Sequence, residues 1–252
     1  MTSSLGIWIV RAEAEKLGRH LEHDLGGKLC GLKIPDGKSN REAFVTCYAS
    51  YRQWILVMAT GIAVRYLQGL PKDKTTDPAI VVLDEGCRFA ISLISGHEGG
   101  ANRLAYRVAN LTGATPVITT ATETLKPLVV GIGCRKGITR EKIDAAIHSA
   151  LSKISRDRNE IRELATIDLK AQEPGLLEWC EENELFLRII PQTLIEQRPW
   201  VANASSWVRE NIGVDGVCEP CALLATFRGR LVLSKTSLNG VAIAIVEEAS
   251  VQ

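Results

Sequence analysis

The sequence has no excess of charge of either sign. Its 252 residues include 30 Lys and Arg against 29 Asp and Glu, which leaves a formal charge of +1. No basic block and no stripe of basic and aromatic residues occurs along it. Proteins that bind nucleic acid carry such basic faces, so nucleic acid is not expected as a partner. Small anionic ligands remain compatible with this composition.

Long apolar runs are missing as well. Near the N-terminus, Ile7 to Val10 is apolar, but Arg11 ends the run. A run this short is neither the core of a signal peptide nor a membrane span. The seven cysteines are scattered and odd in number, which is typical of a reducing compartment rather than of a disulfide framework. We therefore expect a cytoplasmic protein that does not enter a membrane.

Motifs for bound metals and nucleotides are also absent. Cys218 and Cys221 form a C-x-x-C pair, but no second pair stands at a spacing suited to zinc. No H-E-x-x-H motif links the four histidines, and neither the dinucleotide fingerprint nor the P-loop occurs. We therefore expect no protein-bound metal and no cofactor.

The composition and patterning favour an α/β protein. An apolar fraction of 46% is enough for two hydrophobic cores in a chain of this length. Strand-like runs alternate with amphipathic helical patterns, which is typical of parallel sheets covered by helices. We predict two three-layer α/β domains, 1–124 and 125–252, each with a mainly parallel sheet flanked by helices. A short linker at 120–127 joins them.

The predicted elements are delimited by glycine, proline and polar residues. In the first domain the strands are 6–10, 54–59, 80–83, 89–94 and 117–119, and the helices are 14–25, a short one after Thr60, and 101–111, with a polar loop at 33–43. In the second domain the strands are 129–133, 161–167, 185–190, 231–234 and 241–246, and the helices are 139–154, 174–180 and 218–226. Two hairpins are expected, one joining 80–83 to 89–94 and one joining the last two strands.

A glycine-rich loop at 95–100, with the sequence SGHEGG, separates a predicted strand from a predicted helix. Such a loop presents backbone N–H groups and a helix N-terminus, which together favour an anion. A tight connection without a ligand explains the glycines alone about equally well. Because the loop also carries His97 and Glu98, which can transfer protons, we favour a catalytic site. A nucleotide-binding enzyme using this loop is a rival that the missing phosphate motifs disfavour.

His97 is the first choice as general acid or base, because the unperturbed pKa of histidine is close to neutrality. Glu98 is expected to orient it or to exchange protons itself. The N–H groups of Gly99 and Gly100 are candidates for binding an oxyanion or a carboxylate. Ser95 is a weaker candidate as nucleophile, since no G-x-S-x-G elbow surrounds it. The alternative for His97 is a loop histidine that bonds only to the backbone.

Ligands of doubly wound sheets bind at the carboxyl ends of the strands. Gly61, the loop at 95–100, and Thr119 with Thr120 each follow a predicted strand. We therefore expect these three segments to converge on one crevice, which the second domain helps to complete. Asp84 and Glu85 also follow a strand, where an acid pair can share a proton, although an Asp-Glu-Gly turn explains them as well.

Eight segments of the chain resemble the CbiG family of cobalamin biosynthesis. In the first half they are 61–67 (GIAVRYL), 73–86 (DKTTDPAIVVLDEG), 95–105 (SGHEGGANRLA) and 116–123 (PVITTATE). In the second half they are 131–137 (GIGCRKG), 164–176 (LATIDLKAQEPGL), 213–223 (GVDGVCEPCAL) and 233–237 (LSKTS). Longer members of the family carry a further middle segment, which this compact chain lacks.

The resemblance implies hydrolysis of cobalt-precorrin-5A in the anaerobic route to vitamin B12. The δ-lactone of this corrinoid is opened to give cobalt-precorrin-5B, and acetaldehyde is released. The cobalt is carried within the substrate, and contact with neighbouring enzymes of the pathway fits the same role. The alternative is a non-catalytic protein of the pathway that binds or carries corrinoid intermediates.

A corrinoid of this kind carries acetate and propionate arms, which cations and backbone N–H groups bind. Candidates for substrate binding are Gly61, Arg65, Lys74, Asp84, Gly96, Gly99, Gly100, Asn102, Thr119, Thr120, Gly133, Arg135, Lys136, Lys170, Glu173, Glu219 and Lys235. Each lone cation among them is also compatible with a solvated surface charge, and the set in the second half with structural salt bridges.

Overall fold

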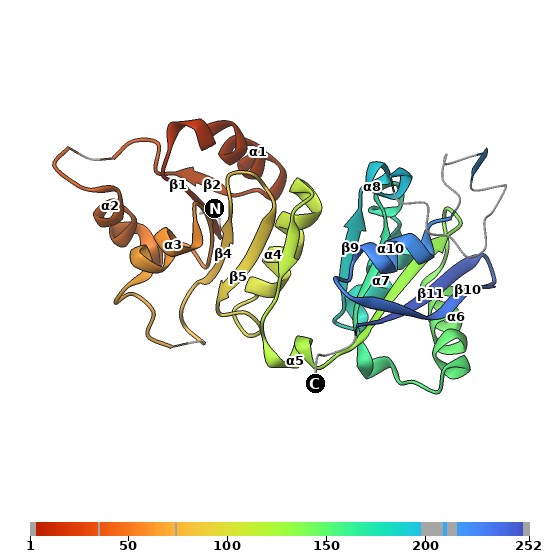
Figure 1. The fold of residues 1–252 in the computed structure, drawn as a ribbon. Helices are drawn as coiled ribbons and strands as arrows, with labels where there is room; N and C mark the ends of the chain where they lie inside the picture. The colour runs from red at the N-terminus through yellow and green to blue at the C-terminus, as the bar shows by residue number, and fades with distance from the viewer. Residues whose placement is uncertain (1–3, 35, 74, 198–208, 211–215, 249–252) are drawn as a thin grey trace. The chain divides into compact units, whose positions relative to one another are not determined.

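The computed structural model of the chain describes residues 4–34, 36–73, 75–197, 209–210 and 216–248. It divides into two compact units, Met1–Thr120 and Ala121–Gln252. Each unit is one sheet flanked by helices (Figure 1), so the α/β fold class is confirmed. No helix in the described ranges has both the length and the hydropathy needed to cross a bilayer.

The first unit is built on a six-stranded sheet in the order β2-β1-β3-β4-β5-β6. The strands are β1 (Leu5–Ile9), β2 (Lys28–Cys30), β3 (Gln53–Val57), β4 (Ala79–Leu83), β5 (Phe89–Ile94) and β6 (Thr115–Val117). Neighbours are parallel except for β4 and β5, which form the expected antiparallel hairpin. Because the hairpin reverses the chain, β5 and β6 run opposite to the first four strands.

Helices cover both faces of this sheet, which makes three layers. They are α1 (Glu15–Leu25), α2 (Asn40–Cys47), α3 (Thr60–Leu67) and α4 (Ala101–Thr112), with 3-10 turns η1 (Ala12–Ala14) and η2 (Tyr48–Ser50). Successive strand residues alternate between faces. On β3, Ile55 accordingly packs in a core with α1 and α4, and Trp54 in a second core with α2 and α3. Phe44 of α2 meets the Trp54 ring edge-on at 5.2 Å between centroids.

Several predicted boundaries in this unit are wrong; for example, the strand predicted at 54–59 is Gln53–Val57. The loop predicted at 33–43 ends early, because α2 begins at Asn40. The side chain of Ser39 accepts a hydrogen bond from the Glu42 backbone, and the Glu42 carboxylate accepts one from Ser39 N at 2.7 Å. This capping box satisfies backbone groups at the helix start. The last strand of the unit, β6, ends at Val117, so Thr119 lies beyond it.

The second unit has a five-stranded sheet in the order β10-β11-β7-β8-β9. The strands are β7 (Leu128–Cys134), β8 (Ile161–Ile167), β9 (Phe186–Ile190), β10 (Gly229–Leu238) and β11 (Val241–Glu248). The pairs β7-β8 and β8-β9 are parallel, whereas β10-β11 and β11-β7 are antiparallel. This sheet is therefore mixed, and the prediction of a mainly parallel sheet is wrong for the second unit, because the hairpin of the last two strands adds two antiparallel pairs. The expected hairpin of the last two strands is confirmed, and it extends the sheet beyond β7.

Helices again pack on both faces. They are α5 (Ala121–Thr124), α6 (Arg140–Lys153), α7 (Pro174–Glu182), α8 (Gln192–Glu196) and α10 (Cys218–Leu224), with η3 (Arg158–Glu160) and η4 (Asp168–Lys170). Ile143 of α6 and Trp179 of α7 share a core with β7, β8 and β11, and Ala222 of α10 lies in the core on the opposite face. A Cβ on Gly131 of β7 would stand 2.7 Å from the carbonyl carbon of Cys218. The missing side chain therefore lets α10 pack directly on the strand.

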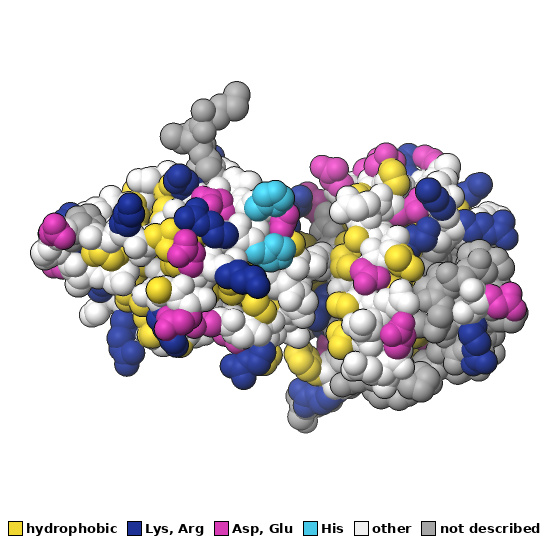
Figure 2. Space-filling view, turned by 90° about the horizontal axis from the view of Figure 1, so that it is seen from above, with side chains coloured by type: hydrophobic (Ala, Val, Ile, Leu, Met, Phe, Trp, Pro, Cys, Tyr) yellow, Lys and Arg dark blue, Asp and Glu magenta, His cyan; other side chains and the backbone are white. Residues whose placement is uncertain are grey.

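Charges of both signs are interspersed over the surface seen in Figure 2. Lysine and arginine side chains alternate there with aspartate and glutamate. This distribution matches the near-zero net charge of +1. On this face an anion site must therefore come from local geometry rather than from a broad positive field.

Candidate functional site

The glycine loop, residues 95–100, connects β5 to α4 and is tied to the first turn of that helix. The N–H of Ala101 donates to Ser95 O at 3.1 Å, and the N–H of Asn102 donates to Gly96 O at 2.9 Å. Gly100 has φ 85° as the N-cap of α4, a left-handed conformation that favours glycine. A Cβ on Gly99 would lie 2.9 Å from Ser95 O. Both glycines are thus required by the tight fold of the loop.

A buried chain of hydrogen bonds supports the loop from below. Ser92 Oγ of β5 donates to Asn102 Oδ1 at 2.8 Å, and Asn102 Nδ2 donates to Thr120 Oγ1 at 3.1 Å. Asn102 is only 2% exposed. Its amide therefore joins β5, α4 and the segment after β6. Among the predicted substrate-binding residues, Gly96, Asn102 and Thr120 are brought together here, since a Cβ on Gly96 would stand 2.8 Å from both of the other side chains.

The two ionisable side chains of the loop, His97 and Glu98, are exposed. Ser95 is half-buried and has φ 56°, an unusual backbone conformation for a residue with a side chain. Its hydroxyl donates to Asp77 O at 3.2 Å. That contact gives Ser95 a carbonyl partner rather than a base, which weakens its candidacy as a nucleophile. The loop offers an imidazole, a carboxylate and backbone N–H groups to a ligand at the surface.

The predicted convergence of Gly61 with this loop is wrong. Ile94 at the end of β5 pairs with Ile80 near the start of β4. The loop therefore lies at the edge where β3 and β4 begin, and a Cβ on Gly100 would stand 3.5 Å from the amide of Gln53. Gly61, by contrast, follows the end of β3 and lies at the opposite edge of the sheet. The hairpin reversal between β4 and β5 is the cause.

The other candidates near Gly61 also belong to that opposite edge. Arg65 is exposed on α3, and its carbonyl accepts from Arg41 Nε at 3.1 Å. Asp84 ends β4 and accepts hydrogen bonds from the N–H groups of Arg88 and Phe89 at 2.9 and 2.8 Å. Partial burial opposes ionisation, but these bonds and the Arg88 guanidinium outweigh it and lower the pKa of Asp84. Asp84 thus forms the hairpin turn, while Lys74 lies outside the described residues.

In the second unit, a buried carboxylate joins two of the predicted segments. Glu173, 6% exposed, accepts from Gly137 N at 2.7 Å and pairs with Lys170 Nζ at 3.0 Å. Gly137 belongs to the connection between β7 and α6, and Glu173 to that between β8 and α7. Both connections follow the carboxyl ends of parallel strands. The structure therefore brings Lys170 and Glu173 together with the 134–138 segment, which carries Arg135 and Lys136, at this edge of the sheet.

Residues around this carboxylate form the rest of the edge. Burial raises the pKa of the Cys134 thiol to about 11; nearby Lys170 lowers it and Glu173 raises it. Cys134 is therefore a neutral thiol near pH 7 and a weak nucleophile. Arg135 and Lys136 are exposed. Gly133 on β7 faces Val217, and an added Cβ there would stand 3.5 Å from the Val217 Cβ, an ordinary packing distance.

Glu219 and Lys235 are also in contact, but through the backbone. Glu219 is 1% exposed and accepts from Lys235 N at 2.9 Å. The register of β10 against β11 shifts between Leu233 and Thr236, so the carboxylate satisfies a backbone N–H at an irregularity in the strand. This contact gives Glu219 a structural task.

The C-x-x-C pair is buried at the start of α10. Burial raises the pKa of the Cys218 thiol to about 12 and the pKa of Cys221 well above its usual value. Both are therefore neutral thiols, and all seven cysteines are free. Within the described ranges, no group of three or more His, Cys, Asp or Glu side chains could hold a metal ion.

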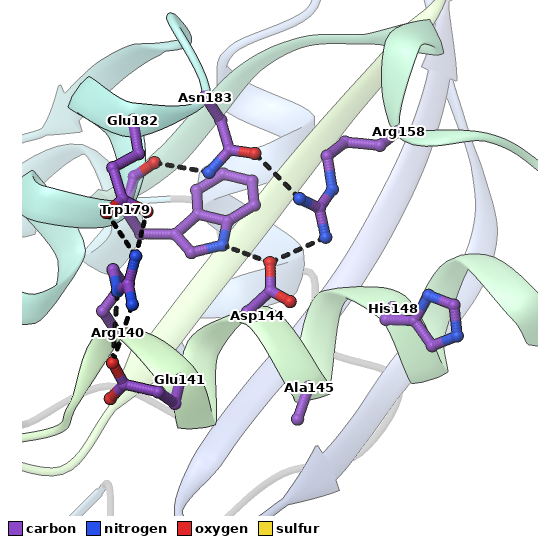
Figure 3. Close-up of a pocket in the computed structure, with 9 residues that line it drawn as sticks. All are labelled: Arg140, Glu141, Asp144, Ala145, His148, Arg158, Trp179, Glu182 and Asn183. Carbon is purple, nitrogen blue, oxygen red and sulfur yellow. Dashed lines mark hydrogen bonds and ion pairs between the residues drawn. The ribbon is translucent and has the colours of Figure 1, made fainter.

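Sequence reasoning gave no indication of an open depression of about 450 Å³ between α6 and α7 (Figure 3). Its lining residues are Arg140, Glu141, Asp144, Ala145, His148, Arg158, Trp179, Glu182 and Asn183. Asp144 Oδ1 accepts from Trp179 Nε1 at 2.9 Å and from Arg158 Nη2 at 2.6 Å, and Arg140 pairs with Glu182. These charges neutralise one another, so we interpret the network as a set of contacts that hold α6 and α7 together. Charged residues on amphipathic helices give no sequence signal for such a network.

The environment of Glu173 predicts how the free energy of unfolding depends on pH. Burial opposes its ionisation, but Lys170 and the N–H groups of the loop outweigh that effect, so the pKa lies below the ordinary 4.5. A carboxyl whose pKa is lower in the folded state stabilises above its unfolded pKa and loses this contribution as pH falls through the folded pKa. At pH 7 we expect Glu173→Gln to lower the free energy of unfolding by about 3 kcal/mol, the cost of breaking a buried pair.

The difference in the free energy of unfolding between the wild type and Glu173→Gln should become smaller below a pH of about 4.5. Urea denaturation of the wild type and Glu173→Gln from neutral to acid pH measures it. Comparing the two proteins removes the contributions of other carboxylates, such as Asp84, whose pKa is also lowered. A gap that stays constant through the acid range contradicts the prediction.

Comparison with known proteins identifies the family. The model described as Cobalamin synthesis G N-terminal matches residues 42–123, and the one described as Cobalamin synthesis G C-terminus matches residues 128–246. The cobalt-precorrin-5A hydrolase of Priestia megaterium is 24% identical over 306 positions, which cover 82% of this chain and 81% of that protein. The probable cobalt-precorrin-5A hydrolase of Methanocaldococcus jannaschii is 26% identical over 276 positions, covering 77% and 85%.

A third relative matches more strongly over a shorter stretch. The cobalt-precorrin-5A hydrolase of Salmonella typhimurium is 54% identical over 83 residues, which are 33% of this chain and 22% of that protein. Among solved structures, CobE of the cobalamin pathway is 26% identical, with a TM-score of 0.47 over 50% of this chain and 93% of CobE. A putative cobalamin biosynthesis protein G homologue from Sulfolobus solfataricus is 19% identical, with a TM-score of 0.39 over 98% and 97%. Since the two family models together span residues 42–246 with a gap of only 124–127, the chain belongs to the CbiG family of cobalamin-synthesis proteins.

Proposed function

We propose that this chain is a hydrolase of cobalamin biosynthesis that converts cobalt-precorrin-5A into cobalt-precorrin-5B with release of acetaldehyde. The observation that carries the proposal is the match of both halves to the CbiG family models. Two relatives that align over 81% and 85% of their lengths are named cobalt-precorrin-5A hydrolase, one of them as probable.

The reaction requires an activated water. Its oxygen adds to the carbonyl carbon of the δ-lactone, the ring C–O bond breaks, and the leaving oxygen takes a proton. The alcohol formed in this way then loses its proton, its C–O bond becomes C=O, and the carbon–carbon bond to the macrocycle breaks. The electron pair of that bond stays on the macrocycle, which takes up a proton, and the extruded carbon leaves with its methyl group as acetaldehyde. His97 is our proposed general base or acid, with Glu98 beside it in the exposed part of the loop. The N–H groups of Gly99 and Gly100 are proposed to bind the oxyanion, as preorganised donors do in other acyl-transfer sites.

The proposed setting is the cytoplasm. Seven free cysteines, none of them in a disulfide, support a reducing compartment. The cobalt would enter with the corrinoid substrate, and neighbouring enzymes of the pathway are proposed partners for delivering and removing unstable intermediates.

A second candidate is a binding or carrier protein for corrinoid intermediates. The alignment with the P. megaterium relative is 306 positions long but uses only 82% of this 252-residue chain. That relative therefore carries segments that this chain lacks. If such a segment completes the catalytic site, the compact chain would bind the corrinoid without turning it over.

The deciding experiment is anaerobic incubation of the purified protein with cobalt-precorrin-5A. Product mass and trapped acetaldehyde report turnover, and the corrinoid absorption spectrum reports binding. We expect stoichiometric acetaldehyde and a product whose mass matches cobalt-precorrin-5B. Binding without acetaldehyde would favour the carrier, and the absence of both would contradict the pathway assignment.

A further inference from the structure

We propose that Glu173 is a positioning residue for a carboxylate-binding loop, residues 134–138, at the edge of the second unit's sheet. In this assignment Glu173 fixes the loop so that Arg135 and Lys136 bind acetate or propionate arms of the corrinoid. The identity of the ligand rests on the proposed function. The loop itself is identified from its geometry and charge.

The carboxylate-binding loop is constrained from two sides. Glu173 accepts from Gly137 N at 2.7 Å, and Gly137 has φ 71°, a left-handed conformation in which a side chain is strained. On the other side, a Cβ on Gly175 at the start of α7 would stand 3.1 Å from Arg140 N and closer still to Ile138 O. Helix α7 therefore packs directly against the backbone at the end of the loop. This contact leaves the loop little conformational freedom.

The loop turns two cations outward. Arg135 N donates to Gly240 O at 3.1 Å, and an added Cβ on Gly240 would meet Arg135 Cδ at 3.1 Å, so the stem of this arginine rests on the β10–β11 turn. Both Arg135 and Lys136 are exposed, and no described residue forms an ion pair with either. Several other arginines of the unit have carboxylate partners, for example Arg158 with Asp144 at 2.6 Å and Arg162 with Glu248 at 2.6 Å. Within the part of the chain that the structure describes, these two loop cations therefore have no carboxylate partner and lie exposed at the surface, where an anion can reach them.

The buried pair beneath the loop fits this task. Removing a carboxylate and an ammonium from water is expensive, so a buried pair adds little net stability compared with an apolar pair, although deleting one partner alone is costly. The pair is therefore better explained by the position that it enforces on the loop. Lys170 also neutralises Glu173, whose side chain is 6% exposed. An anionic ligand above the loop consequently meets the charges of Arg135 and Lys136 without repulsion from a bare carboxylate.

The experiment compares Glu173→Gln with the wild type at neutral pH. Cobyrinic acid, a corrinoid whose arms are free carboxylic acids, serves as the binding probe, and its fully esterified form as the uncharged probe. We expect Glu173→Gln to raise the Kd for cobyrinic acid and the KM for cobalt-precorrin-5A about tenfold, with kcat changed less than about twofold. Affinity for the ester should be the same in both proteins.

Two further variants complete the test. Glu163→Gln removes another buried carboxylate of the unit, 2% exposed on β8 and paired with Arg162, and should leave both constants unchanged. The double variant Arg135→Ala, Lys136→Ala removes the exposed cations directly and should raise the Kd for cobyrinic acid at least as much as Glu173→Gln does. This variant keeps the test valid if Glu173→Gln folds poorly.

Equal affinity of the wild type and the double variant for cobyrinic acid overturns the inference, as does equal loss of affinity for acid and ester. If the wild type binds cobyrinic acid in the expected way but releases no acetaldehyde from cobalt-precorrin-5A, the hydrolase proposal fails and the binding loop stands.

Discussion

Gly131→Ala is expected to lower the free energy of unfolding of the second unit by about 3 kcal/mol or more. The added methyl would lie 2.7 Å from the carbonyl carbon of Cys218 and 2.9 Å from the Cβ of Ala222. Neither is the end of a flexible side chain, so relief requires a shift of α10 away from β7. Cys221 and Ala222 are both completely buried there, so such a shift opens the core. Urea denaturation followed by circular dichroism measures the loss.

The control for this substitution is two residues along the same strand. Gly133 points to the same face of the sheet as Gly131, because strand side chains alternate. Its added Cβ would stand 3.5 Å from Val217 Cβ, an ordinary packing distance. We expect Gly133→Ala to change the free energy of unfolding by less than about 1 kcal/mol. Similar losses in the two variants would mean that α10 does not require the bare backbone of Gly131.

The elements with long, regular patterns are predictable from the sequence. The apolar residues Leu104, Ala105 and Val108 are spaced three and four positions apart, which predicts the helix that the structure has as α4. Gly113 ends this helix with φ 77°, as expected. Short elements lack such periodicity. Strand β2 has three residues, of which only Leu29 is buried, so its pattern is too short to recognise.

Helix α2 was recognisable by a different signal. Its sequence NREAFVTC has few apolar residues, and only Ala43 and Phe44 are buried, so periodicity is weak. Ser39 and Glu42, however, have the spacing of a capping box. This pair places a helix start inside the predicted polar loop at 33–43.

The functional roles of the candidate site residues stay predictions, and their geometry follows only in part from the sequence. The predicted hairpin between 80–83 and 89–94 already implies that the chain reverses, so the glycine loop after β5 cannot share an edge with Gly61 after β3. That step follows from the sequence once strand direction is considered. The contact of Glu173 with Gly137, 36 residues apart, and that of Glu219 with Lys235 depend on loop paths that no local pattern specifies.

His97→Ala is expected to lower kcat for acetaldehyde release by about 10²- to 10⁴-fold, the usual contribution of a general acid or base. The side chain is exposed on a loop whose shape is set by Ser95, Gly99 and Asn102, so its removal should leave the fold and the Kd for substrate almost unchanged. His97→Gln should lower kcat as much as His97→Ala does, because glutamine can accept and donate hydrogen bonds but cannot take up a proton near neutral pH. Single-turnover measurements with cobalt-precorrin-5A separate this loss from slow product release.

The control is His148→Ala, which removes an exposed histidine from α6 of the second unit and should leave kcat unchanged. Glu98→Gln distinguishes the two roles proposed for Glu98. If Glu98 orients His97, the substitution should lower kcat about tenfold; if Glu98 itself carries the proton, it should lower kcat as much as His97→Ala does. If His97→Ala retains the wild-type kcat while Glu98→Gln loses it, the carboxylate is the proton-transfer group and His97 is a bystander on the loop. If neither variant loses activity, the glycine loop serves only as a structural connection, and catalysis must be sought among other residues of the chain.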